Sequence, residues 1–168
     1  MMKQFKTLLI VAVALFGAQT INAQAKTAHV DVNELTSKMP GIIEAQNQLK
    51  KIEATYSADY KTMVEEYQAK AKKYEDEAAT VTDAVNQTRQ GEMQDMGKRI
   101  GEFQENANKE IQKKEGDLMK PLIEKVRASI QKVGKAKGYQ YVLNGSDGSL
   151  LLADGPDLTA DVKKDLGF

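Results

Sequence analysis

Hydrophobic and small side chains recur at intervals of three and four residues from Ile42 to Val133. This spacing places them on one face of an α-helix, so it predicts helical structure over the whole stretch. A polar segment containing a glycine, residues 86–91, lies near its middle. Such a segment favours a turn, and two apolar stripes of similar length can cover each other. We therefore predict two long antiparallel helices joined by a turn within residues 84–91.

Short segments with alternating polarity flank the helical region. Residues 28–32 place Ala28, Val30 and Val32 on one face, which predicts a half-buried strand. Residues 139–143 predict a second strand, and residues 150–153 a third that forms a hairpin with it. The first two strands can pair only if the helical chain runs out and returns. The two ends of the chain should therefore meet in one small body.

Two short helices are predicted in the same body. The first covers residues 33–39, with Asn33 as a suitable N-cap, and Pro40 marks the start of the long helix. The second covers residues 160–166 and is capped by Thr159. Turn-forming residues separate these helices from the strands.

The sequence thus predicts an α+β fold, mostly α, in which a small β-body of three short strands carries a long antiparallel helical-hairpin arm. We expect residues 24–40 and 138–168 to form the body and residues 41–137 to form the arm. Because three short strands cannot enclose a sufficient core, we expect the strands of several chains to be shared in an oligomer. The side chains expected to be buried in this oligomer body are Val30, Val32, Tyr139, Tyr141, Leu143 and Leu151.

The first 23 residues have the pattern of a signal peptide. Lys3 and Lys6 precede an apolar run at residues 8–16, and small residues follow at Ala23 and Ala25. We predict cleavage near Ala23 and export of the remaining chain. The apolar run is too short to span a membrane comfortably, so no stable membrane insertion is expected.

The composition argues against several functional classes. The chain has no cysteine, no tryptophan and one histidine, His29, which leaves little for metal sites or catalytic relays. We predict that it is not an enzyme and has no metal and no cofactor. His29 and Asp31 share a strand face without further partners, so we assign them a structural role. Loss of Lys3 and Lys6 leaves 22 basic and 24 acidic residues, a net charge of −2, which disfavours a nucleic-acid binder.

Glycines concentrate on the returning helix. An interior glycine weakens a helix by roughly 1 kcal/mol relative to alanine, so these positions predict a compliant arm. Close helix packing is the alternative reason for a glycine at such a position. The five glycines are Gly91, Gly97, Gly101, Gly116 and Gly134.

Several segments of this chain resemble a known family, the Skp (OmpH-like) periplasmic chaperones of outer-membrane proteins. Residues 28–35 (AHVDVNEL) are similar to its first strand and following turn. Residues 118–126 (LMKPLIEKV) and 137–143 (KGYQYVL) are similar to its returning helix and second strand, and residues 157–162 (DLTADV) to its closing segment. The resemblance implies a homotrimer whose helical arms enclose a cavity. The resemblance also implies that this homotrimer holds unfolded outer-membrane proteins in its cavity, in the periplasm and without ATP.

Some large side chains of the helical stripes are candidate client contacts. A stripe at helical spacing is a core between helices more often than a binding surface, so both roles stay open. Two other functional classes remain: a structural coiled-coil envelope adaptor that binds one folded partner, and a membrane-surface or nucleic-acid binder, which the near-zero charge disfavours. The candidate contacts are Tyr56, Tyr60, Met63, Tyr67, Met93, Met96 and Phe103.

Overall fold

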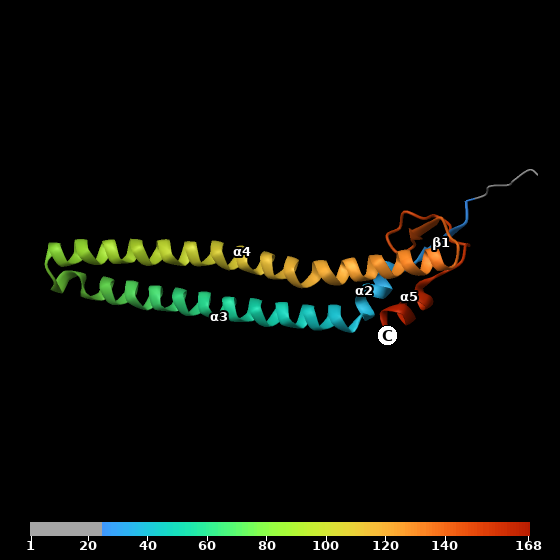
Figure 1. The fold of residues 1–168 in the computed structure, drawn as a ribbon. Helices are drawn as coiled ribbons and strands as arrows, with labels where there is room; N and C mark the ends of the chain where they lie inside the picture. Colours follow the sequence, from blue (N-terminus) through green and yellow to red (C-terminus); the bar gives the residue numbers. More distant parts are fainter. Residues whose placement is uncertain (1–24) are drawn as a thin grey trace, which may run out of the picture.

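The computed structural model describes residues 25–168, so the predicted signal peptide lies outside the described residues (Figure 1). Two long helices and a small domain at one end account for nearly all of this part of the chain (Figure 1). In chain order the elements are β1 (Thr27–Val30), α2 (Val32–Lys38), α3 (Pro40–Glu77), a single 3₁₀ turn (Ala78–Thr80), α4 (Asp83–Ala136), β2 (Tyr141–Asn144) and α5 (Thr159–Leu166).

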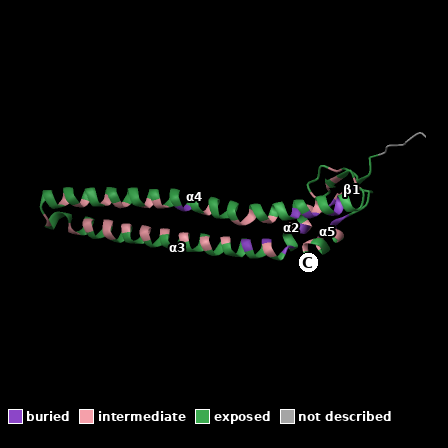
Figure 2. Ribbon diagram, in the orientation of Figure 1, coloured by how far each residue is buried: buried purple, intermediate pink, exposed green. Residues whose placement is uncertain are grey.

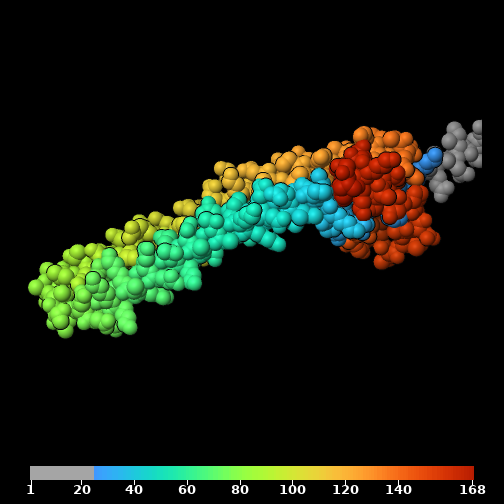
Figure 3. Space-filling model, turned by 90° about the horizontal axis from the view of Figure 1, so that it is seen from below, coloured from blue at the N-terminus to red at the C-terminus, as the bar shows by residue number. Residues whose placement is uncertain are grey.

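Helices α3 and α4 lie antiparallel and form the predicted arm (Figure 3). They have 38 and 54 residues, which correspond to about 57 Å and about 81 Å at roughly 1.5 Å per residue. The two helices are unequal because the last turns of α4 continue into the small domain. We call β1, α2, the turns of α4 from Val126 onward, β2 and α5 the head, and α3 with the rest of α4 the arm.

The turn at the tip of the arm lies at residues 78–82, and the prediction of a turn within residues 84–91 is wrong. The Thr82 hydroxyl caps α4 by accepting a hydrogen bond from the Val85 amide at 3.4 Å, and Asp83 follows in the first turn. The Asn86 side chain donates to the Ala78 carbonyl at 2.9 Å. Residues 86–91 therefore belong to α4, because a good N-cap before them outweighs the weak helix preference of Gly91.

The two strands near the ends of the chain pair, as predicted, and the structure shows that they are parallel. Thr27 of β1 lies opposite Tyr141 of β2, and Val30 lies opposite Asn144. The strand bounds differ from the predicted ones by up to two residues. The long connection through the arm permits the parallel arrangement, which a short turn could not.

The predicted third strand is wrong for the described residues. Residues 150–153 have no regular structure, and Leu151 is fully exposed. The other edge of β1 pairs instead with the segment before α5: the His29 amide donates to the Pro156 carbonyl at 3.0 Å, and the Leu158 amide donates to the His29 carbonyl at 2.9 Å. Residues 156–158 thus occupy that edge, and a hairpin with β2 does not form.

The helix ends explain how the chain changes direction in the head. Asp31, and not the predicted Asn33, caps α2, because its carboxylate accepts from the Glu34 amide at 2.7 Å. Pro40 occupies the first turn of α3, as predicted. Helix α5 begins at Thr159, and Gly167 ends it in a left-handed conformation with φ of 92°.

The head has a closed apolar core. Side chains from β1, α2, α4 and α5 surround the first turn of α3, and the buried residues gather there in Figure 2. In the arm, by contrast, most residues on the facing sides of the helices are only partly buried, and small side chains such as Ala45 and Ala107 are the buried exceptions (Figure 2). The largest fully buried side chains are Leu35, Ile42, Leu158, Val30 and Val162.

Polar contacts fasten α5 to the rest of the head. Lys163 of α5 contacts Glu34 of α2 at 2.5 Å. Asp165 accepts hydrogen bonds from Ser129 at 2.7 Å and from Lys132 at 2.5 Å, both on α4. These bonds join three helices that are distant in sequence, so the position of α5 depends on charged groups as well as on Val162.

The glycines of α4 differ in what surrounds them. A Cβ atom on Gly134 would lie 2.8 Å from Cγ2 of Val142, so this glycine allows β2 to pack closely on α4. At Gly91, Gly101 and Gly116 a Cβ atom would meet nothing within 4 Å. Close packing therefore explains Gly134. For Gly91, Gly101 and Gly116, a compliant helix stays a prediction.

Candidate functional site

The predicted client contacts lie where α3 faces α4, and we call this strip the seam. Its members are all half-buried, so they pack between the helices without being closed off from solvent. The rings of Tyr56 and Phe103 meet edge to face with centroids 6.0 Å apart, and Tyr67 lies beside Gly97. The seam residues are Tyr56, Tyr60, Met63 and Tyr67 of α3 and Met93, Met96 and Phe103 of α4.

Open grooves flank the seam. A groove of about 190 Å³ that is open to solvent lies beside Tyr56, Tyr60 and Phe103, and Ile111 also lines it. A second open groove, of about 110 Å³, lies beside Met63 and Met96. The aromatic and methionine side chains of the seam therefore remain partly accessible.

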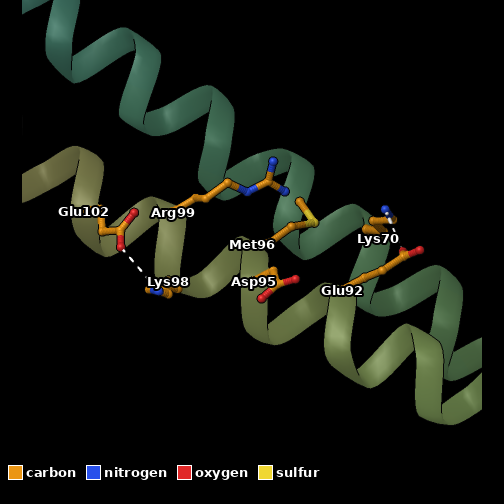
Figure 4. A pocket seen from close by; sticks show the side chains of 7 residues that line it. All are labelled: Lys70, Glu92, Asp95, Met96, Lys98, Arg99 and Glu102. Atoms are coloured by element: carbon orange, nitrogen blue, oxygen red, sulfur yellow. Dashed lines mark ion pairs between the residues drawn. The ribbon is translucent and has the colours of Figure 1, made fainter.

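The groove next to the tip of the arm has a balanced charge. Figure 4 shows that Lys70 comes from α3, that the other lining residues come from α4, and that Met96 and Arg99 point toward α3. Three cations and three anions line the groove, so it does not select a partner by the sign of its charge. The lining residues are Lys70, Glu92, Asp95, Met96, Lys98, Arg99 and Glu102.

The residues expected in an oligomer body fall into two groups. Val30 is buried in the core of its own chain, and Val32 and Tyr139 pack partly buried against that core. Tyr141, Leu143 and Leu151 are instead 59%, 41% and 101% exposed. The sequence analysis missed Leu152, which is 78% exposed beside Leu151. Its apolar neighbours made it look like part of a paired strand, so nothing in the sequence marked it as a surface residue.

Asp31 has a structural role. Its carboxylate caps α2 by accepting a hydrogen bond from the Glu34 amide. In residues 25–168 no group of three His, Cys, Asp or Glu side chains lies close enough to hold a metal ion. No helix in that same range has an apolar stretch long enough to cross a membrane.

Comparison with known proteins agrees with this architecture. Residues 26–166 match the family described as outer membrane protein (OmpH-like). A search of curated proteins finds no match. Among solved structures, the crystal structure of an OmpH-like protein from Caulobacter crescentus, described as a candidate outer membrane chaperone, superimposes with a TM-score of 0.74. The two chains are 15% identical, and the match covers 84% of this chain and 83% of the other. The chain therefore belongs to the OmpH-like family.

Proposed function

We propose that this protein is a periplasmic chaperone that holds unfolded outer-membrane β-barrel proteins between helical arms and prevents their aggregation without ATP. Membership of the OmpH-like family supports a chaperone role. The observation that carries the proposal is the half-buried seam of tyrosine, methionine and phenylalanine along the arm. Adaptable side chains of this kind make many weak contacts with varied sequences.

The assembly that we propose is a homotrimer in which the heads meet and the arms project as the walls of a cavity. Strand β2 has a partner only on the side of β1, so its outer edge is free among the described residues. Such an edge can pair with another chain. Tyr141 and Leu143 expose apolar surface on this strand, and Leu151 and Leu152 expose more on the following loop. Contact between heads would bury these side chains and the free edge together.

The seam residues are the client contacts in this proposal. An unfolded β-barrel strand presents alternating apolar side chains, which need cover from water but no single defined pocket. The partly accessible rings and thioethers of the seam would supply that cover. The mixed charge near the tip would let clients of either net charge approach.

The test combines the mass of residues 24–168 with their holding activity. We expect light scattering to give three times the mass of one chain. We also expect a urea-unfolded outer-membrane β-barrel protein to stay in solution after dilution into buffer with this protein and no nucleotide. A monomer that leaves aggregation unchanged, or a protein that binds only one folded partner at fixed stoichiometry, would overturn the proposal.

A matched pair of variants ties the activity to assembly. Leu143 on β2 and Ile123 on the arm are 41% and 49% exposed, so an aspartate at either position disturbs the single chain little. We expect Leu143→Asp to give monomers with reduced holding activity, because a charge would be buried between heads. Ile123→Asp should keep the mass and the activity of the wild type.

A further inference from the structure

The polar contacts that join the two helices of the arm all lie near the tip in the part of the chain that the structure describes. Lys70 of α3 contacts Glu92 of α4 at 3.0 Å, and Glu77 of α3 contacts Arg89 of α4 at 2.6 Å. The other ion pairs of the arm join residues four positions apart on the same helix, so they do not link α3 to α4. They are Lys61–Glu65, Lys98–Glu102 and Lys109–Glu105.

Tyr74 stands at the centre of this group. The Arg89 guanidinium lies over its ring at 4.5 Å, and the Lys70 ammonium lies 5.5 Å from the ring centroid. The Tyr74 hydroxyl donates a hydrogen bond to Glu92. One aromatic side chain of α3 thus contacts Arg89 and Glu92 of α4, and the five side chains form a continuous network.

This network is more enclosed than ordinary surface ion pairs. The Arg89 side chain is 17% exposed, whereas the Lys98 side chain is 75% exposed. Hydrogen bonds from Tyr74 and Lys70 also hold the pKa of the Glu92 carboxyl below its usual range. Exposed ion pairs contribute little to stability because solvent screens them, and partly enclosed pairs with shared partners contribute more.

Between the network and the head, α3 and α4 are joined by apolar contacts. Half-buried seam residues pack between the helices there and two open grooves flank them, and the described residues form no hydrogen bond or ion pair between α3 and α4 in this part of the arm. Single helices are marginally stable in water, so the distal parts of α3 and α4 depend on staying paired. The head core secures one end of the arm, and the network secures the other.

We propose that Lys70, Tyr74, Glu77, Arg89 and Glu92 form a polar clamp that keeps the distal arm paired and thereby limits access to the seam. When the clamp is released, the helices separate from the tip toward the head. Met93, Met96 and Tyr67 then become accessible before Tyr56 and Phe103 do. The link to client binding rests on the proposed function, whereas the clamp itself does not.

The test is amide hydrogen exchange of the full assembly in the absence of client, comparing the wild type with Arg89→Ala. We expect exchange in residues 60–77 and 83–103 to accelerate by about tenfold, because opening of the distal helices becomes more frequent. Residues 126–136 in the head should exchange at the wild-type rate, which shows that the variant is folded. Tyr74→Phe, which removes only the hydroxyl, should give a smaller acceleration over the same residues.

The matched control is Lys98→Ala, which also removes a cation from α4 but breaks a pair within one helix (Figure 4). We expect it to leave exchange in the distal arm unchanged. Equal acceleration by Lys98→Ala, or no acceleration by Arg89→Ala, would overturn the clamp. If exchange accelerates in Arg89→Ala but holding activity falls, the clamp stands and its role in exposing a client surface is overturned. Failure of the proposed function would instead appear as a wild type without holding activity.

Discussion

The head and the arm use similar apolar spacing but reach different degrees of burial. In the head, α2, α5 and the strand pair surround the end of α4, so Leu35, Val162 and Leu158 are almost completely buried. In the arm, two helices cover only one face of each other, and most stripe residues are half-buried. Periodicity therefore predicts which face of a helix turns inward, whereas complete burial requires a further layer of structure.

The largest expected change in stability comes from replacing one leucine by alanine in each region. Leu35 in the head is 0% exposed, and Leu49 in the arm is half-buried. We expect Leu35→Ala to lower the free energy of unfolding by about 2–5 kcal/mol and Leu49→Ala by about half as much. Urea denaturation at one fixed protein concentration measures both values. Equal losses would show that the arm is packed as tightly as the head.

Replacing a glycine of α4 by alanine should change stability by an intermediate amount, with opposite signs in the head and in the arm. A methyl group at Gly134 would meet Val142 at 2.8 Å, so we expect Gly134→Ala to destabilise the protein by about 1–3 kcal/mol. Gly116 has open space around it, so Gly116→Ala should stabilise the protein by up to about 1 kcal/mol. Thermal unfolding followed by circular dichroism would reveal both shifts. A stabilising Gly134→Ala would mean that β2 does not pack closely on α4.

The smallest effect concerns pH and the Glu34 carboxylate of the head. Hydrogen bonds from Lys163 and Lys38 lower the pKa of Glu34 from 4.5 to about 2. Because the folded pKa is depressed, its stabilisation is present above about pH 4.5 and is lost as the pH falls toward 2. We expect Glu34→Gln to lower the Tm slightly at pH 7 and to match the wild type near pH 2.

The control for this pH dependence is a carboxylate of the arm. Glu65 and Lys61 are exposed and lie 3.7 Å apart, so Glu65→Gln should change the Tm less than Glu34→Gln at pH 7. A Glu34→Gln difference that persists unchanged at pH 2 would contradict a role for the charge. The loss would then come from a difference in hydrogen bonding, because the Glu and Gln side chains have nearly the same shape.

Much of the fold could be predicted because the relevant signals are local. Helical spacing located both limbs of the arm, Pro40 located the start of α3, and alternation located the two strands. The tip was misplaced because two local signals compete there: a polar stretch with Gly91 and the capping sequence at Thr82. The third strand was wrongly predicted because composition alone does not show whether a segment pairs: β2 has a free outer edge among the described residues, but residues 150–153 form no strand along it.

The seam was also predictable from spacing, but the clamp was not. Contact of Arg89 with Tyr74 depends on the register of two helices, and that register follows from the position of the turn. With a turn at residues 84–91, Arg89 would lie in the loop and could not reach across the arm. An error of a few residues in the turn therefore hid the whole cluster.

The parallel strand pair has a consequence for the order in which the molecule folds. Thr27 meets Tyr141, 114 positions later in the chain (27 to 141). Contacts between such distant residues form slowly unless the intervening chain has already become compact. The tip brings near neighbours together first, and the growing hairpin then shortens the distance between the two ends. We therefore expect a newly made chain to pair its helices from the tip toward the head. Its first strand would stay unpaired until almost the last residues have been synthesised.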